Sequence, residues 1–183
     1  MRRIFSMCAG AIATVALAVS AGAQKTTQTG AGSGGSPHVK SEWTIGGAHV
    51  SVEYGRPSLK GRAESTMMPA GKVWRTGADQ ATVITTDKPL RIGNISVAPG
   101  SYTLNTQPGV TEWFLLVGKL GKPGQWGVPY DAALEIARTP MTPGKASAPV
   151  EQLTIAIDAT PAGGTLRIEW GTQSASVPMA VAK

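Results

Sequence analysis

The chain has 183 residues, with 17 lysines and arginines against 11 aspartates and glutamates, a formal net charge of +6 and a single cysteine. This length is natural for one domain and is sufficient to bury a hydrophobic core. The mild positive excess lacks the dense basic stripe that nucleic-acid binding usually requires, so we expect no nucleic-acid partner.

Residues 1–23 are predicted to be a signal peptide. Arg2 and Arg3 precede an apolar run, and Ala21-Gly22-Ala23 matches the small-residue pattern of a signal peptidase site. The run is short and is interrupted by small and polar residues, which makes it a poor transmembrane anchor. We therefore expect an exported protein, periplasmic or extracellular, with no stable membrane anchor after cleavage.

The cut predicted after Ala23 leaves a mature chain with no cysteine, because Cys8 is removed with the leader, and with a formal charge of +4. Such a chain has neither disulfides nor thiolate metal ligands and must be held together by its core. Residues 24–36 are almost entirely Gly, Ser, Thr and Gln, which predicts a flexible tether. A single domain is then expected over residues 37–183.

The domain begins with two alternating segments, 39–45 and 48–54, separated by Gly46-Gly47, which together predict a β-hairpin. Further short strands follow between residues 81 and 117, including a strand at 90–92, a turn at Gly93-Asn94 and a strand at 95–97, and between 134 and 181. The continuous apolar run at 112–117 predicts a central strand buried on both faces. The last three strands are expected at 150–158, 165–170 and 175–181, after a proline-rich connection at 139–149.

This pattern predicts an all-β fold. We count nine or ten short strands and no amphipathic helix longer than about two turns, which favours a single-domain antiparallel β-sandwich or a partly open barrel. Two segments show neither the periodicity of a helix nor that of a strand. The first is the charged stretch from Tyr54 to Thr82, and the second is the Gly- and Pro-rich stretch 118–130. We interpret both as structured loops, and the first as the carrier of function.

Several segments together resemble a known bacterial family. They are VSVEYGRPSLKGR, GKVWRTGADQAT, APGSYTLNT, EWFLLV, QWG, APVEQLTIAID and LRIEWGTQSASVPMAV. They are similar to the family catalogued as domain of unknown function 2911, and the resemblance runs from about Ser36 to Val181. One departure is Asp79-Gln80, where Asn-Glu is expected. The resemblance implies an exported, mainly β protein and no activity, because the family has none assigned.

The first loop also carries candidate ligand-binding side chains. Arginine presents a planar fork that matches carboxylate, sulfate or phosphate, and tryptophan offers a surface on which a ring can stack. If the two loops meet, they would form a site for a small anion or a sugar. The candidate site residues are Arg56, Arg62, Trp74, Arg75, Asp79 and Trp126.

A structural interpretation of the same residues stays open. Arginines in long loops often bond to nearby carbonyls and buried acids, and tryptophans in small β proteins usually belong to the core. Asp79 would then pair with one of the arginines. Arg75 is the stronger functional candidate, because it follows an aromatic residue and precedes Thr76-Gly77, where the chain can turn sharply.

No motif indicates catalysis, a metal site or a cofactor. His38 is expected at a frayed domain start, His49 is expected to face solvent, and no nucleophile or zinc motif accompanies them. A hydrolase-like enzyme using Asp79 or Glu53, with arginines as electrostatic stabilisers, is one alternative to a binding module. A structural envelope protein with a self-satisfied arginine loop is another, and the sequence identifies no protein partner.

Overall fold

The computed structural model describes residues 24–182, so the predicted signal peptide at 1–23 lies outside the described residues. The described chain is almost entirely β-structure, as predicted. Its only helical elements are the single turn α1 (Glu64–Met67) and the short 3₁₀ helix η1 (Ala132–Leu134), and none of its helices has the length and apolarity to cross a bilayer. The strands are β1 (Lys25–Ala31), β2 (Pro37–Ile45), β3 (Ala48–Gly55), β4 (Thr82–Thr86), β5 (Leu90–Ile92), β6 (Ile95–Val97), β7 (Gly100–Gln107), β8 (Trp113–Lys119), β9 (Glu135–Thr160) and β10 (Gly163–Val181).

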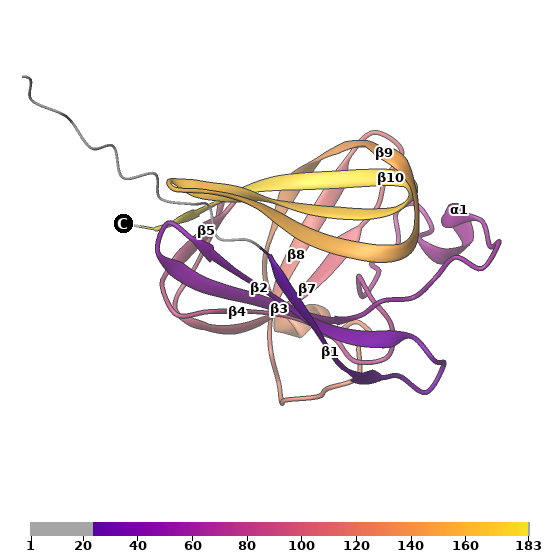
Figure 1. The fold of residues 1–183 in the computed structure, drawn as a ribbon, viewed down its shortest axis with the longest axis horizontal. Helices are drawn as coiled ribbons and strands as arrows, with labels where there is room; N and C mark the ends of the chain where they lie inside the picture. The colour runs from indigo at the N-terminus through magenta and orange to yellow at the C-terminus, as the bar shows by residue number, and fades with distance from the viewer. Residues whose placement is uncertain (1–23, 183) are drawn as a thin grey trace, which may run out of the picture.

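All ten strands are antiparallel and form one open sheet in the order β1-β2-β3-β4-β7-β8-β9-β10-β5-β6. The sheet folds back on itself at β9, whose first part pairs with β8 up to Met141 and whose remainder pairs with β10 from Thr142 onward. β9 and β10 consequently lie over β2 and β3 as a second layer (Figure 1). This arrangement is sandwich-like and confirms the predicted all-β class, without a closed barrel.

The core fills the space between the two layers. Alternate residues of β3, namely Val50, Val52 and Tyr54, are buried, and they face the buried aliphatic side chains of β9 and β10 such as Ile155 and Ile168. The period of two in these strands places every second side chain on the inner face. The predicted β2–β3 hairpin is confirmed, and both glycines of its turn have positive φ, 54° and 77°, as a tight two-residue turn requires.

Strand β8 is buried on both faces, as its apolar run predicts. Leu115 and Val117 belong to the central core, whereas Leu116, only 2% exposed, points to the opposite face and lies outside that core. The loop between β8 and β9 folds over this outer face and covers it. A second covered surface therefore exists on the outside of β7 and β8.

The end of the chain differs from the prediction. The residues at 139–149 were expected to form a connection because proline cannot donate to a β-ladder, but they lie within β9, and the strands expected at 165–170 and 175–181 are parts of the single strand β10. The residues around Pro140 pair with β8 alone, and those around Pro143 pair with β10 alone. Pro140 and Pro143 therefore occupy an edge strand, where proline is tolerated.

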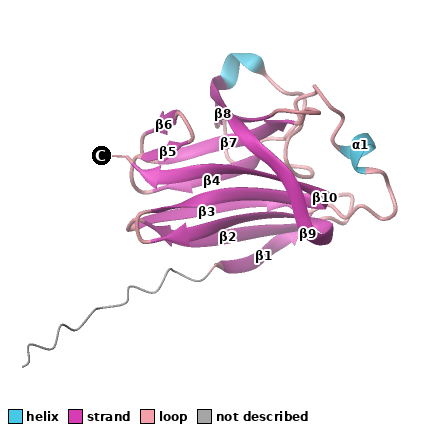
Figure 2. Ribbon diagram, turned by 90° about the horizontal axis from the view of Figure 1, so that it is seen from above, coloured by secondary structure: helices cyan, strands magenta, loops and turns pink. Residues whose placement is uncertain are grey.

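The predicted tether at 24–36 also needs correction. Residues Lys25–Ala31 form β1, which pairs with β2 from Lys25↔Glu42 to Ala31↔Pro37, although every β1 side chain is exposed. A turn at Gly32–Ser36 then leads into β2. Low apolar content argues against core formation, but backbone pairing at a free sheet edge requires no apolar side chain. Figure 2 shows β1 at this edge beside β2.

Candidate functional site

The long loop between β3 and β4 is held at three points by backbone bridges to other segments. Ser58 bridges to Gln152 in β9, Trp74 to Thr106 in β7, and Gln80 to Trp126 in the second loop. The loop, which contains α1, therefore has a defined path along the end of the sheet that lies away from the C-terminus (Figure 2). It is a structured loop, as its composition predicts.

Two of the three candidate arginines anchor this loop. Arg56 donates from Nε to the Leu153 carbonyl oxygen at 3.0 Å and from Nη2 to Thr154 Oγ1 at 3.1 Å, which ties the start of the loop to β9. Arg62 donates from Nε to the Leu59 carbonyl oxygen at 2.8 Å and from Nη2 to the Ser58 carbonyl oxygen at 2.6 Å. These contacts match the structural interpretation of Arg56 and Arg62.

Trp74 contributes to a stacked aromatic pair. Its ring lies 5.5 Å from that of Trp170 in β10, with an interplanar angle of 11°. Trp170 is 1% exposed, and its indole N–H donates to the Glu151 carbonyl oxygen at 3.0 Å. Trp74 is half-buried, so the pair presents one partly accessible aromatic surface on a rigid support.

Arg75 is placed differently from the other two arginines. Its Nε donates to the Gly77 carbonyl oxygen at 3.1 Å, while Nη1 and Nη2 have no hydrogen-bond or ion-pair partner among residues 24–182. The second loop packs on its aliphatic stem, because a Cβ added at Gly127 would lie 2.7 Å from Arg75 Cδ. The stem is thus fixed, and the end of the guanidinium group is unpaired.

Asp79 is buried, 8% exposed, but does not pair with an arginine. Its Oδ1 accepts from the Ser33 hydroxyl at 3.2 Å, and its Oδ2 contacts His38 Nε2 at 3.2 Å. The prediction of an arginine partner is therefore wrong. At Asp79 the first loop contacts the turn at Gly32–Ser36. Asp79 has a φ of 62°, and its carboxylate points toward that turn.

His38 is the residue that sequence reasoning missed. It lies in β2, paired with Gly55, and is not frayed, while His49 is exposed as expected. The contact between His38 and Asp79 joins residues that are distant in sequence and depends on where the long loop returns. No local pattern in the sequence signals it.

The two loops meet, as the binding hypothesis required. Gly127 N–H donates to the Asp79 carbonyl oxygen at 2.9 Å, and Ala81 N–H donates to the Gln125 carbonyl oxygen at 2.9 Å. An open groove of about 570 Å³ lies between the two loops and β10. The groove is lined by four of the six candidate residues, Arg62, Trp74, Arg75 and Asp79, together with others that include Lys60 and Trp170.

The groove has an excess of positive charge. Lys60, Arg62 and Arg75 line it, and its one carboxylate, Asp79, has both oxygens occupied by Ser33 and His38. The charge that a ligand would meet is therefore cationic, beside the indole of Trp74. Arg56 does not line this groove, because its side chain is directed to β9.

Trp126 is separated from the other candidates. It is 51% exposed and lines a smaller hollow of about 80 Å³ between the second loop and the outer face of β7 and β8. The structure therefore does not bring Trp74 and Trp126 together on one ligand surface. The two loops meet through their backbones, whereas these two indoles face different spaces.

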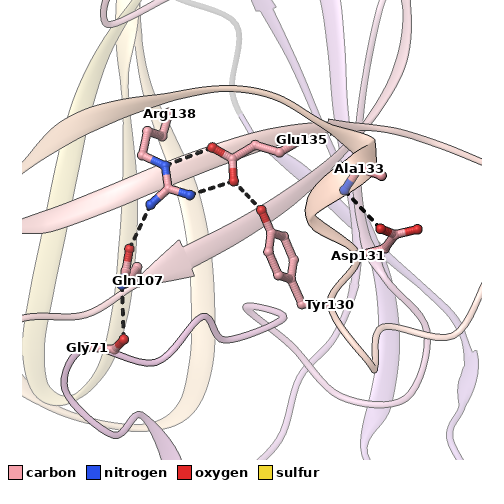
Figure 3. Close-up of polar contacts among 7 residues, drawn as sticks. All are labelled: Gly71, Gln107, Tyr130, Asp131, Ala133, Glu135 and Arg138. Carbon is pink, nitrogen blue, oxygen red and sulfur yellow. Dashed lines mark hydrogen bonds and ion pairs between the residues drawn. The ribbon is translucent and has the colours of Figure 1, made fainter.

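A polar network runs from the rim of this hollow to the first loop (Figure 3). The Tyr130 hydroxyl donates to Glu135 Oε2, and Arg138 donates to both Glu135 oxygens, at 2.8 Å from Nε and 2.6 Å from Nη2. Arg138 Nη1 then donates to Gln107 Oε1 at 3.0 Å, and Gln107 donates to the Gly71 carbonyl oxygen at 3.0 Å. The network connects β9, β7 and both loops.

The network fixes the protonation of its members. The hydrogen bonds from Arg138 hold the pKa of Glu135 below its usual value, and the same contact raises the pKa of Arg138. Burial and the neighbouring Glu135 carboxylate raise the pKa of Tyr130 to about 12. At neutral pH Glu135 is therefore a carboxylate, and Tyr130 remains a hydrogen-bond donor.

The described residues contain no group of three or more His, Cys, Asp or Glu side chains placed to hold a metal ion. Taken together, the fold and the site define an all-β, sandwich-like protein in which one long loop builds a cationic groove with an aromatic wall. A family model described as "Protein of unknown function (DUF2911)" matches residues 36–179, and the chain belongs to this family. Comparison with curated proteins and comparison with solved structures both give no match.

Proposed function

We propose that the protein is an exported binding module whose groove binds a small anionic ligand. The ligand resembles a carbohydrate in one respect, because it has a ring that can stack on Trp74. The proposal of export rests on the sequence of residues 1–23. The proposal of binding rests on one observation above all: the end of the Arg75 guanidinium group has no partner among residues 24–182, and the one carboxylate that lines the groove, Asp79, already bonds to Ser33 and His38.

Two physical arguments support an anion. A guanidinium group with two free N–H-bearing nitrogens matches the paired oxygens of carboxylate, sulfate or phosphate. Lys60 and Arg62 add positive charge at the groove rim. Asp79 is the one acidic residue among the residues that line the groove. The groove is also large enough for a ring, since small-molecule sites typically have volumes of about 300–1,000 Å³.

Binding is better supported than hydrolysis. Asp79 has both carboxylate oxygens engaged, and Glu53 is exposed at the outer face of β3, where it lies 3.8 Å from Lys40 Nζ. Neither carboxylate of the hydrolase hypothesis is therefore placed as a free base in the groove. A purely structural role accounts for Arg56 and Arg62 but leaves the free end of Arg75 unexplained.

The test is a calorimetric and thermal-shift screen of the full mature chain with sulfate, phosphate and galacturonate, the last combining a carboxylate with a sugar ring. At least one probe should bind, with an affinity that falls as salt is raised. Arg75→Ala should abolish this binding with a nearly unchanged melting temperature, and Arg75→Lys should retain only part of it. Arg91→Ala is the matched control, because it removes an exposed arginine of β5 outside the groove.

Two results would overturn the proposal. The first is equal binding by the parent and Arg75→Ala, which would place the anion elsewhere. The second is a large loss of stability in Arg75→Ala with no probe bound by the parent, which would make Arg75 a structural residue like Arg56.

A further inference from the structure

The hollow beside Trp126 is a second candidate site, built on the outer face of the sheet and independent of the groove. Its floor is Leu116, which is 2% exposed, and its wall is Thr103 of β7. The second loop and the start of β9 supply the rim, with Trp126, Tyr130 and Asp131 among its residues. The hollow holds about 80 Å³ and is only partly open to solvent.

Thr103 indicates that this space is suited to a polar group. The residue is 8% exposed, its side chain lines the hollow, and its hydroxyl makes no side-chain hydrogen bond within residues 24–182. A Cβ added at Gly118 would lie 2.6 Å from Thr103 Oγ1, so the absence of a side chain at Gly118 leaves room around the hydroxyl. Trp43 Nε1 is the one side-chain polar atom of residues 24–182 that is enclosed without a partner, so the Thr103 hydroxyl is reached from the hollow and can accept a hydrogen bond from a group that enters it.

The other lining groups define the charge of that partner. The hollow is lined by two carboxylates, Asp131 and Glu135, and by no lysine, arginine or histidine. Glu135 forms an ion pair with Arg138, so the negative charge that a ligand would meet comes from Asp131. Asp131 uses Oδ1 to accept from the Ala133 N–H at 2.9 Å, which leaves Oδ2 available. The Asn105 side chain also lines the hollow and has no side-chain hydrogen bond within the described chain. Its carbonyl oxygen can accept a hydrogen bond.

The aromatic rim adds a second attraction for positive charge. Trp126 is 51% exposed, and Tyr130 is kept neutral by its bond to Glu135. An ammonium group near an indole face is attracted by the ring quadrupole, and tryptophan is the strongest such partner. A volume of about 80 Å³ is far below the roughly 300 Å³ at which small-molecule pockets begin, so it admits one small group and not a sugar ring.

We propose that this hollow binds the primary ammonium group of a small amine, with Thr103, Asn105 and Asp131 as acceptors and Trp126 as the aromatic wall. A primary ammonium has three N–H donors, which matches three acceptors, two from β7 and one from the segment between β8 and β9. The hollow therefore has the opposite charge preference to the groove, and the proposal stands whether or not the groove binds an anion.

The experiment uses n-butylammonium as the probe and butan-1-ol as its neutral analogue, each titrated into the full mature chain labelled with ¹⁵N. The indole N–H resonance of Trp126, identified as the signal that disappears in Trp126→Phe, should shift with n-butylammonium and saturate. Butan-1-ol should bind at least about threefold more weakly, since cation–π and charge contributions at exposed sites have about that size. The alcohol thus isolates the contribution of charge.

Two near-isosteric variants test the assigned acceptors. Asp131→Asn keeps the cap on Ala133 and removes the charge, and Thr103→Val keeps the shape and removes the hydroxyl. Each should weaken n-butylammonium binding at least about threefold. Asp87→Asn is the control, because Asp87 likewise accepts a backbone N–H, from His49 at 2.8 Å, but lies outside the hollow. This variant should bind like the parent.

Three outcomes would overturn the proposal. They are equal binding of butan-1-ol and n-butylammonium, unchanged affinity in both Asp131→Asn and Thr103→Val, and a saturating shift of the Trp126 signal by methyl glucoside but not by the amine. The last outcome would assign a neutral sugar to the Trp126 surface instead. None of these results depends on anion binding in the groove.

Discussion

Arg56 and Arg75 belong to one loop but use their guanidinium groups differently. Arg56 donates to a backbone carbonyl and a hydroxyl of β9, whereas Arg75 makes one local bond, and its two terminal nitrogens have no partner in the described part of the chain. The same residue type therefore serves packing in the first case and is available to a ligand in the second. The hydrogen-bond partners of the two guanidinium groups distinguish these roles, and amino-acid composition does not.

Arg56→Ala should lower the free energy of unfolding by about 1–3 kcal/mol, because it leaves the Leu153 carbonyl and the Thr154 hydroxyl without their donor. Urea denaturation of the parent and the variant measures this difference. Arg91→Ala, at an exposed position of β5, should change the free energy of unfolding by less than about 0.5 kcal/mol. Equal effects in the two variants would contradict an anchoring role for Arg56.

The pKa of Tyr130 gives a second prediction at this scale. The folded state holds the Tyr130 proton up to about pH 12, above the value of 10 for a free tyrosine. The contribution of Tyr130 to stability is then complete below pH 10 and is lost as the pH rises from 10 toward 12. Tyr130→Phe should therefore lose less stability than the parent over this interval.

Urea midpoints of the parent and Tyr130→Phe between pH 8 and 12 provide the measurement. The comparison cancels the effects of lysine deprotonation and of Tyr54, whose pKa burial also raises. Parallel curves for the two proteins would show that the Tyr130–Glu135 contact does not form as described.

Individual roles were only partly predictable from the sequence. Arg75 could be preferred over Arg56 because it follows Trp74 and precedes a glycine turn, and the structure leaves its end free. The Asp79 contact to His38 could not be predicted, since it depends on a loop returning beside the N-terminal turn. The separation of Trp126 from Trp74 likewise depends on which side of the loop each indole faces.

Strand β1 shows how a segment without apolar side chains can be ordered. Its backbone pairs with β2, and Asp79 of the first loop bonds both to Ser33 in the turn that follows β1 and to His38 at the start of β2. A carboxylate that accepts at both oxygens thus joins the N-terminal segment to the loop that builds the groove. The strand depends on a few polar contacts and edge pairing, and none of its side chains is buried.

Asp79→Gly should raise amide hydrogen exchange in residues 25–36 at least severalfold, with little change in β3 or β10. Glycine tolerates the φ of 62° at this position, so the variant removes the carboxylate without backbone strain. Asp79→Asn, which also tolerates this φ and keeps a side-chain acceptor, is the matched control and should show a smaller increase. Uniform exchange throughout the chain in Asp79→Gly would instead indicate loss of the whole fold.

The sequence predicted most elements but not how they join. The ranges 90–92 and 95–97 coincide with β5 and β6, because each alternates apolar and polar residues and the Gly93-Asn94 turn separates the two. The continuity of β9 through Pro140, Pro143 and Pro149 was missed, because a proline penalty assumes two hydrogen-bonded neighbours. Edge position depends on the partner strands, and these lie outside the local sequence.

On the scale of the whole molecule, β9 is the element that joins the two layers. The first part of β9 pairs with β8, and its second part pairs with β10. Its inward side chains contribute to the core between the layers. A layer without β9 would lose both its pairing with this strand and the core side chains that the strand contributes. We therefore expect the two layers to unfold together.

Ile155→Ala tests this expectation, because Ile155 is fully buried in the second part of β9 and contributes to the common core. The variant should lower the free energy of unfolding by about 2–5 kcal/mol, the usual cost of such a cavity. Ile136→Ala is its control on the same strand, since Ile136 is 42% exposed and should cost less than about 0.5 kcal/mol. If β9 couples the layers, tryptophan fluorescence and far-ultraviolet circular dichroism should still give one coincident transition in Ile155→Ala. Two separated transitions would mean that each layer is stable without the other, and the groove would then belong to a smaller folding unit than the whole sheet.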